Sequence, residues 1–489
     1  MDELPPEMLE LVARECDFAS LKQLRLVNKH ISTVTTPIVF EHSYMGYFPY
    51  CLESFCELAR SPLAKHVKAF TFFADLIPDW GRWNWQARVN ATPGFTVETA
   101  IFYSDDQLEE AWKRYEVLRA SQLSWTEQDD SFTFKRHFDM LPNVNEAHLV
   151  HANMSPWTQD PPPVWKTIRE VILVSPWDWR SIERNSRNRN NLLEGQPALC
   201  LFEAIGYRAR SSDIRQITTL TIHRKHYQSY MDLYGTTFAK GGNGRTEPSS
   251  PAHYLRYRDI LEAFKPLEEI RFAHFEARGV GVAAAQELSN LLRQAKKLRR
   301  LDVRFGQYNV SADSRGDQEE ATSASLEASS DPSGHWPDLK HLSLNMNVTY
   351  PGFLEFLRQH RATLRSLELR NMIVGKAPAL LHEIPKVLRL DHVDVSEIWS
   401  ANPDHIPNVK GFAYNAYVTS GTGKKVDSTC DKPDYNGVYE NAVKEYLLRQ
   451  RQELPELKIE GRNGMGSVNS EAESSEDDED DEDEDEDDE

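Results

Sequence analysis

A short apolar phrase recurs along the chain, with apolar residues at positions i, i+3 and i+5. Residues two apart point to the same face of a strand, so each phrase predicts a strand with one buried face. The clear copies are Ile217, Leu220, Ile222; Leu267, Ile270, Phe272; Leu298, Leu301, Val303; Leu339, Leu342, Leu344; and Leu364, Leu367, Leu369. Weaker copies occur at Val67 with Phe70, Val144 with Leu149, Ile168 with Val171 and Leu173, Leu388 with Leu390, and Val409 with Phe412 and Tyr414.

The phrases are spaced regularly and alternate with helical patterns. Leu342, Leu367, Leu388 and Phe412 are separated by 25, 21 and 24 residues, and amphipathic patterns occupy residues 108–120, 254–264, 283–298 and 352–364. Strands and helices with one apolar face each bury those faces by stacking on their neighbours. We therefore predict an α/β fold, near the α+β boundary, built as a curved solenoid. Alternation alone leaves a doubly wound or barrel-shaped fold open.

The predicted body, residues 46–460, resembles the degenerate leucine-rich repeats that commonly follow an F-box. Its period lies within the roughly 20 to 29 residues of a leucine-rich repeat unit, although most copies lack the asparagine that usually follows the strand phrase. The resemblance implies an irregular solenoid. Three polar stretches, residues 240–251, 311–334 and 420–437, interrupt the pattern and predict mobile insertions.

Alternation along each strand places the residues between and just after the apolar landmarks on the concave face. Arginines recur there on successive strands, and the planar guanidinium binds carboxylates or phosphates through paired donors. An ordinary solvated face would give the same pattern for any single residue. Taken together, they are predicted to bind a target protein: Arg271, Asp302, Arg304, Asn345, Glu368 and Arg370, flanked by Ser343, Arg389 and Asp391.

The amino-terminal segment, predicted as residues 1–45, contains three short helical patterns. Pro5 and Pro6 suit a helix entry, Asp17 suits the cap of a second helix, and Pro37 is predicted to stop the third. Fewer than about 40 residues cannot enclose so many apolar side chains. Either the rest of the chain or a separate protein must therefore cover the remainder.

These helices resemble the F-box pattern, an LPxELL-like opening followed by a leucine-rich second helix, and TPIVFEH resembles the ending common in F-box proteins of filamentous fungi. Cys16 stands where a leucine is usual, and the closing tryptophan is absent. F-box segments bind the Skp-type linker subunit of a cullin-RING ubiquitin ligase. The resemblance implies this role for Leu4, Pro5, Pro6, Glu7, Met8, Leu9, Val12, Leu21, Leu24, Val27 and Ile31.

Charge is concentrated at the carboxyl end. The formal net charge is -20, but residues 471–489 contain 16 of the 76 acidic side chains, so the body is nearly neutral. A near-neutral body gives no electrostatic footprint for nucleic acid, and residues 461–489 are predicted to be a disordered acidic tail. The five scattered cysteines suit reduced thiols, and no apolar stretch approaches a membrane span. We expect neither nucleic acid nor membrane as a partner, and a cytoplasmic or nuclear location.

No catalytic or metal-ligating motif stands out in the sequence. The string GTGKK lacks the upstream glycine of a phosphate-binding loop because Val418 occupies that position, and His223 with His226 lack accompanying ligands at metal spacing. We therefore expect no catalytic residue, no metal and no cofactor. The expected function is a substrate-receptor adaptor of a Skp-cullin-F-box ubiquitin ligase. The alternative is a leucine-rich repeat scaffold not coupled to ubiquitination, and an enzyme hidden in an alternating fold lacks any supporting motif.

Overall fold

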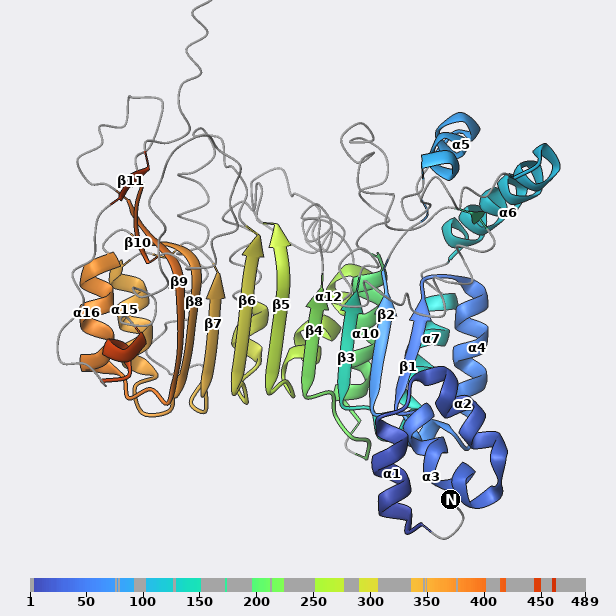
Figure 1. Cartoon of the computed structure of the whole chain (residues 1–489), viewed down its shortest axis with the longest axis horizontal. Coiled ribbons are helices and arrows are strands. Elements are labelled where there is room, and N and C mark those ends of the chain that lie inside the picture. Colours follow the sequence, from blue (N-terminus) through green and yellow to red (C-terminus); the bar gives the residue numbers. More distant parts are fainter. Residues whose placement is uncertain are drawn as a thin grey trace, which may run out of the picture.

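The computed structural model shows a long sheet with helices packed on one face and a small helical segment at the amino terminus (Figure 1). The structure describes residues 4–74, 77, 80–91, 103–125, 129–150, 172–173, 196–211, 213–223, 251–276, 290–306, 336–345, 348, 350–374, 377–401, 414–418, 444–449 and 460–462. The predicted insertion 240–251, apart from its last residue, the insertions 311–334 and 420–437, and the acidic run at 471–489 lie outside these residues.

The sheet contains nine parallel strands in chain order, each hydrogen-bonded to the next. They are β1 (His42–Gly46), β2 (Ala69–Phe73), β3 (Glu146–Val150), β4 (Thr219–His223), β5 (Glu269–Glu276), β6 (Arg300–Gly306), β7 (His341–Asn345), β8 (Ser366–Val374) and β9 (His392–Ala401). Two antiparallel strands, β10 (Tyr414–Val418) and β11 (Glu460–Arg462), continue the sheet beyond β9. The α/β class is therefore confirmed.

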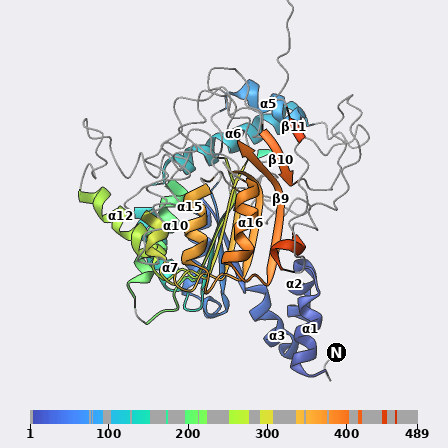
Figure 2. The same cartoon turned by 90° about the vertical axis from the view of Figure 1, so that its left-hand side faces the viewer.

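Helices between the strands lie on one face of the sheet (Figures 1 and 2). They are α4 (Pro49–Arg60), η1 (Ala64–His66), α7 (Asp129–Asp139), α10 (Gln196–Ala209), α12 (Pro251–Phe264), α15 (Tyr350–Gln359) and α16 (Ala377–Val387). Helices α5 (Arg82–Ala91) and α6 (Asp105–Leu123) stand beyond the carboxyl ends of the first strands. Parallel neighbouring strands need a crossover connection between them, and these helices lie within such connections.

The strand registers separate apolar and polar side chains onto opposite faces. One aligned row across β1 to β9 consists of Ser43, Phe70, Ala147, Leu220, Ile270, Leu301, Leu342, Leu367 and Val393, and the next inward row runs from Met45 to Val395. Every member of both rows is buried, and the apolar ones form one core with the helices. The rows between them face the opposite side, which we call the open face.

The five clear phrases coincide with β4 to β8, and the weaker copies at Val67 and Val144 precede β2 and β3. The copy at Leu388 and Leu390 is wrong, because β9 begins at His392 and its inward residues are Val393 and Val395. The strand β1 was missed because Ser43 replaces an apolar landmark. Ile168 and Val171 of one weak copy and Val409 and Phe412 of another lie outside the described residues, and Tyr414 of the latter begins the antiparallel strand β10.

Several predicted boundaries also shift. Helix α15 ends at Gln359 rather than at 364, α12 includes residue 251, and β11 includes Gly461 and Arg462, which were assigned to the tail. The predicted boundary at residue 45 falls inside β1, so the helical segment runs directly into the sheet.

The amino-terminal segment forms three helices, α1 (Pro6–Arg14), α2 (Phe18–Val27) and α3 (Lys29–Val39). Pro6 occupies the first turn of α1, and the Asp17 carboxylate accepts a hydrogen bond from the Ser20 amide at 2.8 Å, as predicted for a cap. The predicted stop at Pro37 is wrong, since α3 continues to Val39. A proline so near the end removes only one late hydrogen bond.

A buried arginine joins α10 to the turn before β3. Arg208 is fully buried, and its guanidinium donates to the carbonyl oxygens of Phe138, Val144 and Arg215 at 3.2, 3.1 and 2.7 Å. Burial lowers the pKa of Arg208 to about 10, while Asp139 acts in the opposite direction. The side chain therefore satisfies carbonyl groups that helix and strand geometry leaves unpaired.

Candidate interaction surfaces

The helices α1 to α3 carry an unusual amount of exposed apolar surface. Half of the 14 exposed large apolar side chains among the described residues lie between residues 4 and 27. They are Leu4, Met8, Leu11, Val12, Phe18, Leu26 and Val27, which we call the apolar surface. Leu11, Val27 and Leu26 are 61, 62 and 78% exposed. A cluster of this kind on a soluble unit marks an interaction site more often than scattered apolar residues do.

A second, buried face of the same helices holds the segment together. Ala13, Leu21 and Val39 form a small cluster separate from the main core, and Leu9 and Ile31 are 4 and 2% exposed. On α1, the exposed Met8, Leu11 and Val12 share one side at spacings of three and four residues, and Leu9 with Ala13 share another. The helix is thus apolar on two sides, of which the chain itself covers one.

The structure divides the predicted linker-binding residues accordingly. Leu9, Leu21 and Ile31 are buried within the segment, and Leu24 is half-buried, so they support the surface rather than form it. Exposed positions are Leu4, Pro5, Pro6, Glu7, Met8, Val12 and Val27. Phe18, Leu11 and Leu26 were not among the predicted positions, because sequence alone does not tell which apolar stripe of a short helix faces inward.

Glu41 connects the helical segment to the sheet. Its carboxylate lies 3.2 Å from the Arg14 guanidinium of α1 and 2.8 Å from the Lys68 ammonium before β2. Burial alone would raise the pKa of Glu41, but the two cations hold it below its usual value. Figure 2 shows the three helices below the sheet, on the side of the open face.

The open face is rich in histidine and aromatic side chains at its β1 to β3 end. The rings of His42 and Tyr44 stack at 4.5 Å, and His42 Nε2 lies 2.7 Å from the Thr71 hydroxyl. Burial lowers the pKa of His42 to about 4 and, together with the nearby His42, that of His148 to about 3. These imidazoles are therefore neutral packing groups at neutral pH.

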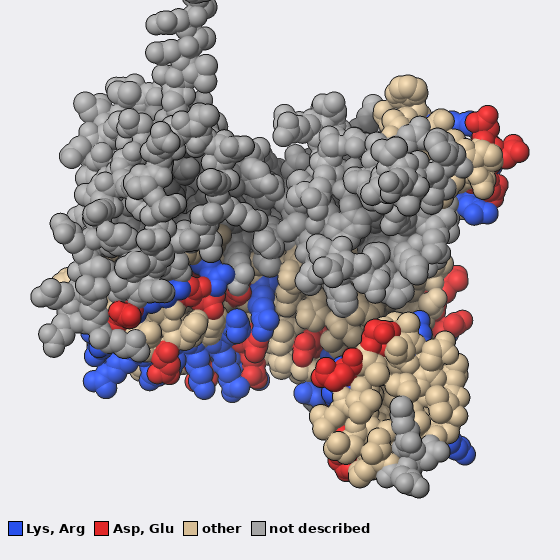
Figure 3. Space-filling view, viewed as in Figure 1, with Lys and Arg blue, Asp and Glu red and all other residues tan. Residues whose placement is uncertain are grey.

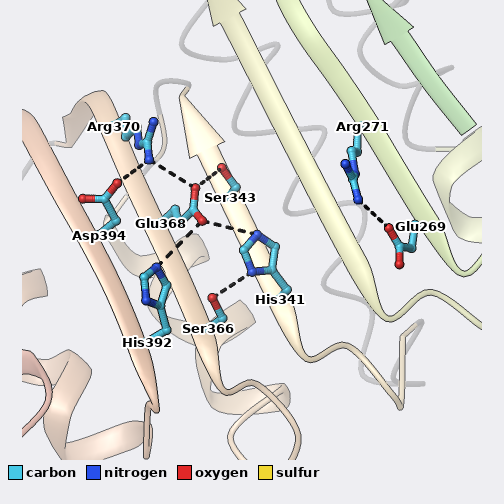
Figure 4. A network of polar contacts seen from close by, with 9 residues as sticks. All are labelled: Glu269, Arg271, His341, Ser343, Ser366, Glu368, Arg370, His392 and Asp394. Carbon is cyan, nitrogen blue, oxygen red and sulfur yellow. Dashed lines mark hydrogen bonds and ion pairs between the residues drawn. The ribbon is translucent and has the colours of Figure 1, made fainter. Parts of the chain in front are cut away.

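The open face carries a charged network at its β7 to β9 end (Figure 4). Glu368 accepts a hydrogen bond from the Ser343 hydroxyl at 3.2 Å, and its carboxylate also lies 3.7 Å from His341. Arg370 bonds to Asp394, which the Lys444 ammonium contacts at 2.9 Å. Burial alone would raise the pKa of Asp394, but Lys444 and Arg370 lower it. Cross-strand pairs of opposite charge stabilise neighbouring strands.

Three buried donor atoms on this face have no hydrogen-bond partner among the described residues. They are Nε of Arg271, Arg300 and Arg370, on strands β5, β6 and β8. Buried polar atoms are nearly always paired in folded proteins. These atoms mark a part of the open face whose hydrogen bonding the described residues do not complete.

The predicted target-binding residues share the open face. Arg271, Asp302, Asn345, Glu368 and Arg370 belong to its rows, and Arg304 aligns with Asn345 although its side chain lies outside the description. Asp302 is only 6% exposed and Ser343 is 2% exposed between longer neighbours. Arg389 and Asp391 precede β9, so placing them on the concave strip was wrong. Arg300 and His341 were missed because they precede the middle landmark of each phrase.

Within the described part of the chain, no helix is long and apolar enough to cross a bilayer, and no cluster of three His, Cys, Asp or Glu side chains could hold a metal ion. The described cysteines carry free thiols, and burial raises the pKa of Cys51. A scan against protein-family models matches none, and a search of curated proteins finds no significant match to this sequence.

Proposed function

We propose that the chain is a non-catalytic substrate-receptor subunit of a Skp-cullin-F-box ubiquitin ligase. Helices α1 to α3 would act as an F-box-like segment that docks a Skp-type linker subunit, and the sheet would present a target protein. The exposed apolar surface on these helices is the observation that carries the proposal. Such a subunit acts by proximity, because it raises the local concentration of the target beside the ligase.

Two features support the docking role of the helices. Their own core is small and separate from that of the sheet, so a partner that covers the apolar surface would stabilise the segment. Seven of the 14 exposed large apolar side chains among the described residues lie within residues 4–27, whereas the other seven are distributed from residue 50 to residue 207. A helix face of this kind fits an apolar groove on a partner.

The order of the strands supports a degenerate leucine-rich repeat body. Each strand from β1 to β9 pairs in parallel with its neighbour in the chain, and each apolar phrase from β4 to β8 contributes one strand. In repeat proteins of this kind a unit contacts only its neighbours and leaves an extended face for binding. The unpaired Nε donors of Arg271, Arg300 and Arg370 lie on that face.

Binding of purified Skp-type linker subunit to the full chain tests the docking role. The double substitution Val12→Asp, Val27→Asp places charge at two exposed positions without disturbing the buried cluster. We expect binding to weaken at least 30-fold, which is about 2 kcal/mol. Measurement is by calorimetry, with circular dichroism to confirm that the helices remain.

A matched control places the same charges on α6, where Val117 and Leu123 are 67 and 50% exposed. Val117→Asp, Leu123→Asp should leave linker binding unchanged. If the unaltered chain does not bind the linker subunit, or if both double variants weaken binding equally, the adaptor role is wrong. The scaffold role would then be the better account.

The target-binding role of the open face needs a separate test. Arg271→Gln, Arg300→Gln removes two unpaired donor groups on neighbouring strands. Proteins captured by the chain in its native cell extract, identified by quantitative mass spectrometry, should lose their target components while the linker subunit is retained. If the variant retains every captured protein, the open face does not bind the target.

A further inference from the structure

A row of basic side chains follows the amino-terminal edge of the sheet from β5 to β9. The turns at residues 265–268, 296–299, 337–340, 361–365 and 389–391 contain eight Lys and Arg residues and three acids. The cations, which we call the basic rim, are Lys265, Lys296, Lys297, Arg299, Lys340, Arg361, Arg365 and Arg389. All except the half-buried Arg365 are exposed. Figure 3 shows blue side chains gathered along the lower border of the molecule, beneath these strands.

The register of the sheet gives this rim a regular spacing. The amide of Lys340 donates to the Arg299 carbonyl at 2.8 Å, and the amide of Arg365 donates to the Lys340 carbonyl at 2.9 Å. Three cations therefore stand on consecutive strands, about 4.8 Å apart. The equivalent positions are Glu41, Lys68, Asn145, Thr218 and Glu268 before β1 to β5 and Asp391 before β9, so consecutive cations at this position occur only before β6 to β8.

Acidic partners within the rim do not neutralise it. Arg299 pairs with Glu268 at 3.0 Å and Lys265 pairs with Glu262 of α12 at 2.6 Å, and Asp338 and Asp391 are the other acids in these turns. With Glu262 counted, the eight cations lie beside four acids, so a net positive charge of four remains at one edge of a body that is nearly neutral as a whole. An exposed linear array of cations attracts a linear polyanion.

The chain itself contains a matching polyanion, with 16 acidic side chains in residues 471–489. We propose that the basic rim binds this acidic run of its own chain. An extended chain places side chains on one side about every 7 Å, against about 4.8 Å between neighbouring strands of the rim, so the two match in charge and not in spacing. Since the two are covalently linked, the local concentration of the acidic run at the rim is in the millimolar range.

The covalent connection is long enough for this contact. β11 ends at Arg462 and pairs through β10 with the carboxyl end of β9. The rim lies at the opposite end of β9, whose ten residues span about 33 Å. Residues 463–489 could reach about 90 Å if fully extended. This is longer than β9, so the acidic run can reach the rim.

Occupancy of the rim would have a regulatory consequence. The rim borders the open face at Arg300 and His341, so the acidic run would compete with any other acidic segment that binds across this edge. Because the attraction is between exposed charges, it would weaken steeply with ionic strength. The proposal does not depend on linker docking, since the rim and the apolar surface share no residue.

Zero-length carbodiimide cross-linking of the full chain tests the contact. At low ionic strength, carboxylates of residues 471–489 should link mainly to Lys265, Lys296, Lys297 and Lys340, and at least fivefold less to the exposed Lys22, Lys29 and Lys113. These links should fall several-fold in 0.5 M salt. An even distribution over all exposed lysines would overturn the proposal.

A synthetic peptide of residues 471–489 gives a second measurement. It should bind the chain ending at residue 470 at least tenfold more tightly than the full chain, where the tethered run competes. The substitutions Lys297→Glu, Lys340→Glu, Arg361→Glu should weaken peptide binding at least tenfold, measured by fluorescence anisotropy. Arg60→Glu, Lys65→Glu, Lys113→Glu makes the same charge change elsewhere and should weaken it less than twofold.

Equal loss in the two triple variants would mean that net charge alone drives binding and would overturn the proposal. So would equal peptide affinity of the full and shortened chains. A single-stranded oligonucleotide serves as the competing polyanion. If it binds the shortened chain through the rim while the peptide does not, the rim is a nucleic-acid site and the proposal is wrong.

Discussion

The helical segment and the sheet differ in how completely they bury their apolar side chains. Across β1 to β9 both inward rows are buried, so the sheet and its helices form a closed core. Helices α1 to α3 have a small separate core and leave seven large apolar side chains exposed. The described part of the chain thus contains one region with a continuous core and one that leaves much of its apolar surface uncovered.

The largest expected effect tests the closed core of the body. Arg208→Met removes a guanidinium that donates to buried carbonyl oxygens of the α7 to β3 turn and of Arg215. Since each unsatisfied carbonyl costs about 1 to 3 kcal/mol, the free energy of unfolding should fall by at least about 3 kcal/mol, measured by urea denaturation. The exposed Arg215→Met is the control. A change below about 1 kcal/mol would contradict the role given to Arg208.

The next largest effect tests whether the helical segment unfolds separately from the sheet. Leu9→Ala removes a buried side chain of α1 from the helical segment, with an expected loss of about 2 to 3 kcal/mol in the free energy of unfolding. Amide hydrogen exchange in residues 6–39 should accelerate, while exchange in β4 to β8 stays the same. Leu11→Ala on the exposed side of α1 is the control. Equal acceleration in the sheet would show that the two regions unfold as one unit.

Protonation of buried histidines should make the stability of the sheet depend on pH. His42 and His148 have folded pKa values of about 4 and about 3, below the ordinary value near 6.5, because burial disfavours the imidazolium. The unfolded chain therefore binds more protons, and stability should fall as the pH drops below about 6.5, by about 2 kcal/mol per histidine at pH 5. His42→Gln, His148→Gln should flatten this dependence. The exposed pair His30→Gln, His392→Gln should not.

The smallest effect concerns the apolar surface. Leu26→Gln alters a side chain that is 78% exposed, so the free energy of unfolding should change by less than about 0.5 kcal/mol. Self-association at high concentration should decrease, because less apolar area meets water. Light scattering and urea denaturation of the same sample measure both. A large stability loss would mean that α2 is covered by the chain itself.

The sequence predicted the body better than the surfaces. The phrase that ends in Leu367 and Leu369 locates β8 because burial on one strand face forces a period of two. The same pattern mislocated β9, because Leu388 and Leu390 have the apolar spacing of a strand but precede β9 in the chain. In the helical segment, Asp17 marked a cap through local chemistry, whereas Leu9 and Leu11 could not be sorted into buried and exposed. That distinction depends on contacts between distant residues.

Parallel pairing between successive strands also affects how this protein can be altered. Register is fixed by bonds between β6 and β7 themselves, and residues 307–335 lie between Gly306 and the first described residue before β7, Trp336. Lengthening this connection would leave every ladder bond intact. A fluorescent label or affinity tag inserted there would therefore report on the molecule without changing its architecture.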